Sequence, residues 1–220
     1  MGRRDQEVKL AAPLSAEAKG QIRQANEGLI LAAAERVFAG AGFNGATMAQ
    51  IAEESGLPKA NLHYYFGNKE ALYRAVLARI LGDWLAPTHG IIPEADPAQA
   101  IGDYVRSKMA LSAARPDASK VWANELLHGA FFVKQLLATD LRATVLAKSV
   151  VIDQWIAEGK MLPVDSTYLF FSIWAATQTY ADFDVQVSAV LGKSSLAKAD
   201  YRRATEHVVA LVLRGCGLQP

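Results

Sequence analysis

The sequence predicts an all-α protein, with a small N-terminal unit of three helices followed by a larger helical body. Apolar residues recur at spacings of three and four along the chain, which is the period of an amphipathic helix. No segment alternates apolar and polar residues between turn residues, so strands are not expected. Glycines, prolines and capping residues fall between the periodic segments, where helices begin and end.

The N-terminal unit begins after residues 1–14, which are polar, show no pattern and are interpreted as a flexible arm. A helix is predicted from about Ser15, and Gly40 and Gly42 end it. Three- and four-residue spacing gives it one apolar face, formed by Ile30, Ala33, Ala34, Val37 and Phe38.

Two short helices are predicted next. Thr47 is a good N-cap for the first of them, and the Ser55-Gly56 pair breaks it. Pro58 suits the first turn of the second, which runs through Phe66.

Longer helices fill the rest of the chain. Asn68 caps the first of them and Pro87 stops it, while Asp96-Pro97 opens the next. The same reasoning predicts helices over 69–84, 97–114, 116–127, 131–137, 140–159, 165–191 and 196–215.

Composition limits the classes of protein that this chain can represent. Apolar residues make up 51% and charged residues 20%, so the chain can bury a core and is not intrinsically disordered. Basic and acidic residues number 23 and 22, so any DNA-binding role must be local. No uncharged stretch is longer than that from Ser166 to Ala181, which is too short and too polar to span a membrane. With one cysteine and no secretory signal, a cytoplasmic protein without membrane contact is expected.

The two short helices, held between longer ones, form a helix-turn-helix unit. Such a unit places its second helix in the major groove of DNA, while the N-terminus of the first approaches a phosphate. No acidic residue lies between Ser55 and Lys69. The groups able to reach phosphates or base edges in this segment are those of Lys59, Asn61, His63, Tyr64, Tyr65 and Lys69, and Ala60 is small enough to allow close approach.

These features also fit a protein of another kind. Two short helices around a glycine turn occur in many helical proteins, and residues 1–70 carry eight basic and eight acidic residues. An interaction or architectural module with the same helices and no small-molecule effector therefore stays open as an alternative.

A resemblance favours DNA binding. The run TMAQIAEESGLPKANLHYYFGNKEALYRAVL, with Tyr65-Phe66 followed by Lys69-Glu70, resembles the N-terminal domain of TetR-family transcriptional regulators. The preceding run AAAERVFAGAGFNGAT is similar to the first helix and loop of that family.

The resemblance implies an Ω-shaped homodimer that binds operator DNA. Each subunit has a DNA-binding domain, here 15–68, and an effector-binding and dimerisation domain, here 69–220. The DNA contacts that it implies are Thr47, Lys59, Asn61, His63, Tyr64, Tyr65 and Lys69, and the small Ala60 is expected among them from its size.

The body offers a candidate effector site. Trp174 and Gln178 are four residues apart and share a helix face. A buried amide beside an aromatic plane suits a flat heterocycle, which stacks on the ring while the amide reads its edge. Alternatively, Trp174 is an ordinary core residue and Gln178 bonds to backbone groups.

The segments ILGDWLAP, YVRSKMALS and IWAATQTYADFDVQVSAV resemble the body of a pyrimidine-responsive member of the family. This implies that the effector is a pyrimidine or one of its catabolites. Further ligand contacts implied by matching positions are Trp84, Lys108, Asn124 and Glu125.

An enzyme is not expected. The four histidines, His63, His89, His128 and His207, lie far apart without metal-ligand spacing. Cys216 has no catalytic signature around it, and no glycine loop is built to hold phosphate. The sequence therefore predicts no catalytic residue, metal or cofactor.

Dimerisation is expected through the last two predicted helices, about 165–191 and 197–214. Their surface is too apolar to be solvated on both sides. The residues expected at the contact are Ala175, Ala176, Ala181, Val185, Val208, Leu211 and Val212.

Overall fold

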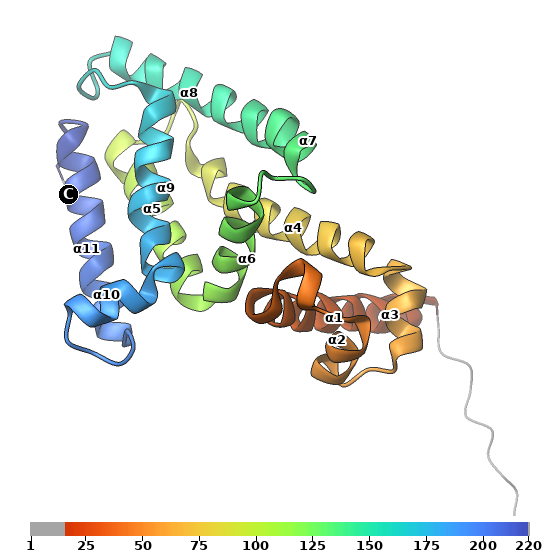
Figure 1. Ribbon diagram of the computed structural model, residues 1–220. Coiled ribbons are helices and arrows are strands. Elements are labelled where there is room, and N and C mark those ends of the chain that lie inside the picture. Colours follow the sequence, from red (N-terminus) through yellow and green to blue (C-terminus); the bar gives the residue numbers. More distant parts are fainter. Residues whose placement is uncertain (1–15, 220) are drawn as a thin grey trace, which may run out of the picture.

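A computed structural model describes residues 16–219, and all regular structure within that range is helical, which confirms the predicted fold class (Figure 1). The predicted flexible arm, residues 1–14, lies outside the described residues. The elements are α1 (Ala16–Gly45), α2 (Met48–Ser55), α3 (Lys59–Phe66), α4 (Lys69–Leu85), η1 (Ala86–Gly90), α5 (Pro97–Ala114), α6 (Pro116–Leu127), α7 (Lys134–Leu136), η2 (Leu137–Leu141), α8 (Arg142–Ala157), α9 (Ser166–Asp182), α10 (Asp184–Val190) and α11 (Lys198–Gly215).

The head consists of α1 to α3 and the first turns of α4, and local signals set its boundaries. Thr47 accepts a hydrogen bond from the backbone N–H of Gln50, whose side chain in turn accepts from the N–H of Thr47. This capping box satisfies donors that the helix cannot pair internally. Gly56 follows α2 with a φ of 68°, a left-handed conformation that favours glycine. Asn68 caps α4 by accepting from the N–H of Ala71.

The predicted end of the first helix is also a real feature of the backbone. Gly42 has φ 67° and ψ 175°, so the helix is interrupted there before one further turn to Gly45. The side chain of Phe43, after this kink, turns back toward Phe38 and Tyr73 in the head core.

The body has its own core between α5, α8, α9 and α11, on the side of the molecule away from the head (Figure 1). Trp155 and Tyr104 are fully enclosed in it, and the Nε1–H of Trp155 donates to the carbonyl of Pro93 at 3.1 Å. α4 runs from the head into the body, so its C-terminal half packs against α6.

The prediction of one helix over 165–191 is wrong in one respect, because the structure breaks it at Phe183 into α9 and α10. Two acids flank the break and both reach α6: Asp182 accepts a hydrogen bond from Ser119, and Asp184 pairs with Lys120 at 3.1 Å. Residues two apart point to different sides of a continuous helix. The break therefore lets both carboxylates face the same neighbouring helix.

Head and body are joined by an ion-pair network around Arg115, which lies between α5 and α6. Its guanidinium bonds both carboxylate oxygens of Glu35 on α1, and it also pairs with Asp83 on α4. Glu35 is only 8% exposed, whereas the Asp83 side chain is 43% exposed, so the network extends from the interior to the surface.

The predicted dimer surface is partly corrected. Ala181 and Val208 are buried in the body itself and cannot contact a partner. Val185 and Leu211 are 79% and 58% exposed, and nearby Phe183 and Val190 are exposed as well. Within the described residues, no helix is both long and apolar enough to cross a membrane.

Candidate functional site

The outer surface of α3 carries most of the predicted DNA contacts. Lys59, Ala60, His63 and Tyr64 are exposed and recur at the spacing of one helix face. Tyr64 is 76% exposed, a high value for a large aromatic side chain. Asn61 is half-buried beside them. This face presents one cation, one imidazole and one phenol without an acidic residue in α3.

Tyr65 is held more firmly than its neighbour. It is half-buried, and its hydroxyl accepts a hydrogen bond from Asn26 Nδ2 on α1 at 3.2 Å. Its ring meets that of Tyr64 edge to face, with centroids 5.1 Å apart. Tyr65 therefore fixes the position of α3 on α1.

Lys69 is turned inward. Its ammonium donates to the carbonyls of Phe43, Ala46 and Asn44 at 2.7, 2.9 and 3.4 Å. It also lies 4.6 Å from the centre of the Phe43 ring. Because an ammonium has three donors, all donors of Lys69 are used in holding the end of α1 and the residue after it.

Thr47 is exposed at the start of α2, where its hydroxyl also donates to Gln50 Oε1 at 2.9 Å. This places a neutral, hydrogen-bonding group at the positive end of a helix dipole. Such a terminus is suited to approach a phosphate.

Four of the six predicted ligand residues surround one cavity of about 90 Å³ in the body. Trp84 comes from α4, Lys108 from α5, and Trp174 and Gln178 from α9. The lining residues that the sequence did not predict are Leu81, Leu85, Trp122, Leu126, Leu137 and Leu141. They are apolar residues on helical faces, and nothing in their spacing separates a cavity wall from an ordinary core.

Lys108 is the most unusual group in this cavity, which we name the effector cavity because four of the predicted ligand residues line it. It is 3% exposed, donates no hydrogen bond to any described residue, and lies with Nζ 4.3 Å from the centre of the Trp84 ring. Burial lowers the pKa of Lys108 to about 7, and the nearby Asp182 opposes that shift only in part. Burial likewise raises the pKa of Asp182. The cavity thus contains a strong donor whose hydrogen bonds are not already made.

Trp174 is positioned by a hydrogen bond from its Nε1–H to the hydroxyl of Tyr104 at 2.7 Å. Burial raises the pKa of Tyr104 to about 12, so this hydroxyl stays protonated at neutral pH. Phe171 packs against the indole with centroids 5.6 Å apart. The indole is therefore held in one orientation, as a stacking surface requires.

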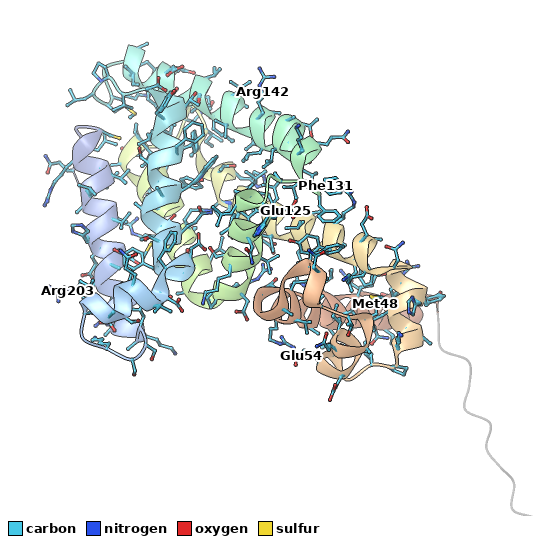
Figure 2. All side chains as sticks on the ribbon, viewed as in Figure 1. Met48, Glu54, Glu125, Phe131, Arg142 and Arg203 are labelled. Atoms are coloured by element: carbon cyan, nitrogen blue, oxygen red, sulfur yellow. The ribbon has the colours of Figure 1, made fainter. Side chains whose placement is uncertain are left out.

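Asn124 and Glu125 do not reach the effector cavity. They line a separate junction pocket of about 470 Å³, which also involves residues from the end of α1. Figure 2 shows Glu125 and Phe131 close together where the body meets the head. The structure therefore divides the predicted ligand residues between two places.

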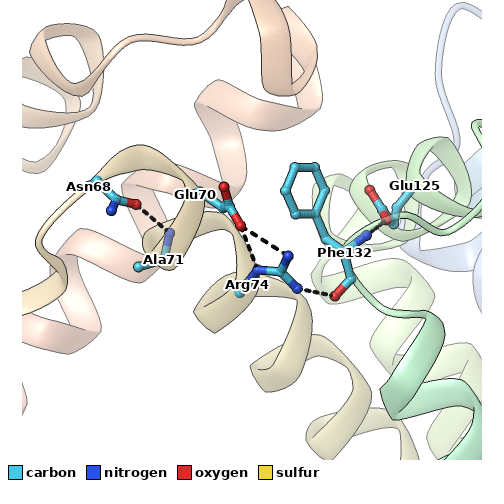
Figure 3. Close-up of polar contacts among 6 residues, drawn as sticks. All are labelled: Asn68, Glu70, Ala71, Arg74, Glu125 and Phe132. Atoms are coloured by element: carbon cyan, nitrogen blue, oxygen red, sulfur yellow. Dashed lines mark hydrogen bonds and ion pairs between the residues drawn. The ribbon is translucent and has the colours of Figure 1, made fainter.

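Polar contacts hold the edge of the junction pocket (Figure 3). Glu125 accepts from the backbone N–H of Phe132 at 2.6 Å, and Arg74 donates to the carbonyl of Phe132 at 2.9 Å. Arg74 also pairs with Glu70, one turn earlier on α4. Burial first, and Glu125 second, raise the pKa of Tyr73.

Comparison with known proteins identifies both parts of the chain. Residues 30–76 match the model of the bacterial regulatory proteins of the tetR family, and residues 77–219 match that of the YcdC-like protein C-terminal region.

Among individual proteins, the HTH-type transcriptional regulator RutR of Escherichia coli K12 is 42% identical over 186 residues, which make up 84% of this chain and 88% of that protein. The HTH-type transcriptional repressor NicS of Pseudomonas putida is 36% identical over 103 residues, or 45% of this chain and 47% of that protein.

Solved structures share the fold. A tetR-family regulatory protein from Rhodococcus RHA1 superposes with a TM-score of 0.69 at 21% identity, covering 89% of this chain and 98% of that one. The fatty acid degradation regulator FadR from Bacillus halodurans gives a TM-score of 0.64 at 19% identity, covering 86% and 94%. At this identity the likeness concerns the fold alone.

Proposed function

The chain belongs to the tetR family of bacterial regulatory proteins and is a transcriptional regulator related to RutR, and from this premise we propose that it represses transcription by binding a near-palindromic operator as a homodimer. The observation that carries the DNA-binding part is the exposed, acid-free face of α3. NicS, a relative over about half the chain, is itself named a repressor. Because its target is bacterial operator DNA, the protein acts in the cytoplasm.

In this proposal the predicted DNA contacts have different roles. Lys59 binds a phosphate, while Ala60, Asn61, His63 and Tyr64 approach base edges or the sugar-phosphate backbone. Thr47 brings the N-terminus of α2 to a phosphate. Tyr65 and Lys69 act indirectly, since both already bond to α1 or to the loop after it.

Two-fold symmetry sets the form of the operator. An isologous dimer through α9, α10 and α11 would bury the exposed Val185 and Leu211 and present two α3 helices. Its half-sites lie about one helical turn, or a simple multiple of it, apart.

The effector of this regulator is a small planar heterocycle, most simply a pyrimidine or its catabolite. The effector cavity supports this choice, because it combines a fixed indole, an amide and a buried ammonium. Trp174 stacks on the ring, Gln178 pairs with its edge, and Lys108 donates to a ring carbonyl. A cavity of about 90 Å³ is far smaller than the roughly 300–1,000 Å³ of sites for drug-sized ligands, so the effector is small.

Effector binding releases the operator in this proposal. A ligand shifts a conformational equilibrium only by its differential affinity for the two states. The expected coupling free energy between effector binding and operator binding is about 1–3 kcal/mol, or roughly 5- to 150-fold in operator affinity.

Calorimetry with uracil, thymine and a ring analogue without carbonyls tests the effector. Uracil or thymine should bind and the analogue should not, because buried polar groups would be left unpaired. Gln178→Ala should weaken binding, whereas Asn124→Ala, in the junction pocket, should not. Equal heats for all three compounds would remove the pyrimidine assignment.

The alternative is a helix-turn-helix module without an effector. It requires that no nucleobase or catabolite raises the melting temperature of the protein, because a ligand that prefers the native state must raise it. The polar groups gathered in the effector cavity favour the effector-binding regulator.

A further inference from the structure

The junction pocket is separate from the effector cavity and shares none of its lining residues. Its volume, about 470 Å³, lies within the range of small-molecule sites. The end of α1 and Tyr73 form one side, and α6 with the segment after it forms the other. A molecule bound here would contact head and body at once.

Aromatic rings form much of the pocket wall. Phe43, Tyr73 and Phe132 contact one another with centroids between 4.6 and 5.2 Å apart. Phe131 meets Phe132 edge to face at 5.0 Å, and it is 76% exposed. Faces of such rings carry negative potential and attract cations.

Glu125 adds a formal negative charge to this wall. The residue is only 6% exposed, and its carboxylate accepts a hydrogen bond from one neutral donor, the N–H of Phe132. Among residues 16–219, no nitrogen of a Lys, Arg or His side chain lies within 4.0 Å of the Glu125 carboxylate. A buried charge without a counter-charge is costly, so a cation that enters the pocket gains from pairing with it.

Arg74 and Lys69 do not fill this role, and His128, which lines the pocket, has its Nδ1 bonded to the carbonyl of Asn124 at 2.8 Å. Arg74 lies 4.9 Å from the centre of the Phe132 ring, but its guanidinium pairs with Glu70. Lys69 lies over Phe43 and is held by backbone carbonyls. Both use ring faces of the cluster, and neither lines the pocket.

We propose that the junction pocket binds a small organic cation, an ammonium ion carrying an aromatic or alkyl group. The ammonium pairs with Glu125, and its substituent packs among Phe43, Phe131 and Phe132. A neutral molecule of the same shape gains the packing without the charge pairing, and an anion is repelled. Binding would favour the head-to-body arrangement described here, because the walls come from both parts.

Calorimetry on the full chain tests this with benzyltrimethylammonium as the cation, benzyl alcohol as the neutral compound and benzenesulfonate as the anion. The cation should bind once per chain, and the other two should bind at least about tenfold more weakly, the factor that corresponds to about 1.4 kcal/mol. Glu125→Gln keeps an acceptor for the Phe132 N–H and should lower the affinity for the cation about tenfold.

A second variant guards against misfolding of Glu125→Gln. Phe131→Leu changes an exposed side chain, so the protein should fold normally and bind the cation severalfold more weakly. Val150→Ala is the matched control, because Val150 is also exposed and apolar but lies on α8, away from the pocket. This variant should bind the cation as wild type does. No measurable binding of the cation, equal affinity for all three compounds, or unchanged affinity in both pocket variants would overturn the proposal.

Uracil separates this proposal from the proposed function. With uracil present, the cation should still bind, whereas strict competition would place it in the effector cavity and overturn the proposal. If uracil itself does not bind, the pyrimidine assignment fails, and the cation experiment still decides the junction pocket.

Discussion

The α3 surface of the head and the two pockets of the molecule place their polar groups in opposite ways. On α3 the hydrogen-bonding and charged side chains of Lys59, His63 and Tyr64 point to solvent, over a core of apolar residues. In the body, Lys108 and Glu125 are almost completely buried among aromatic rings. Exposed polar groups suit contact with a long polymer such as DNA, whereas enclosed polar groups suit contact with a small molecule.

The test of this contrast with the largest expected effect is the dependence of stability on the protonation of Lys108. Its pKa of about 7 in the folded protein lies below the ordinary 10.5, so between these values the unfolded chain binds the extra proton. Stability should therefore rise with pH in that window, by up to about 1.4 kcal/mol per pH unit for this group. Urea unfolding from about pH 7 to pH 9 should show this slope in wild type and its loss in Lys108→Met.

Lys134→Met is the control, since Lys134 is an exposed residue on α7. The stability of Lys134→Met should change with pH as that of wild type does across the same range. Parallel curves for wild type and Lys108→Met would mean that Lys108 keeps an ordinary pKa and that the effector cavity is wetter than the structure indicates.

A second test breaks the connection between the two regions. Arg115→Ala leaves Glu35 buried on α1 without its partner, and should cost about 2–3 kcal/mol in the free energy of unfolding after allowance for partial exposure. Arg106→Ala removes an exposed pair with Asp103 and should cost about 0–1 kcal/mol. Similar losses in the two variants would show that the network around Arg115 is no stronger than a surface pair.

The third test compares two lysines within the head. Lys59→Ala should weaken operator binding and lower the slope of log affinity against log salt by about one unit, since one phosphate contact is lost. Lys69→Ala should instead destabilise the fold by about 1–3 kcal/mol, because three carbonyls lose their donor, and should leave the salt slope unchanged. Fluorescence anisotropy at several salt concentrations, with melting curves, separates these effects. A smaller salt slope in Lys69→Ala than in wild type would show that the Lys69 ammonium contacts a DNA phosphate.

Local signals were enough to predict most of the helices. Thr47 with Gln50, Asn68 with Ala71, and Asp96 with Gln99 each form their caps within three residues, and the structure contains all of them. Such bonds depend only on the neighbouring sequence, which is why the boundaries in the head could be read without knowing the fold.

The sequence alone thus determined the all-helical class, the caps and the residues of α3, because their causes lie within one or two turns of chain. The tertiary structure decided the break at Phe183, the inward turn of Lys69 and the separation of Glu125 from Trp174. Each of these depends on a partner more than twenty residues away or on which face of a helix is covered. Packing between distant elements sets that coverage, and no spacing along the chain records it.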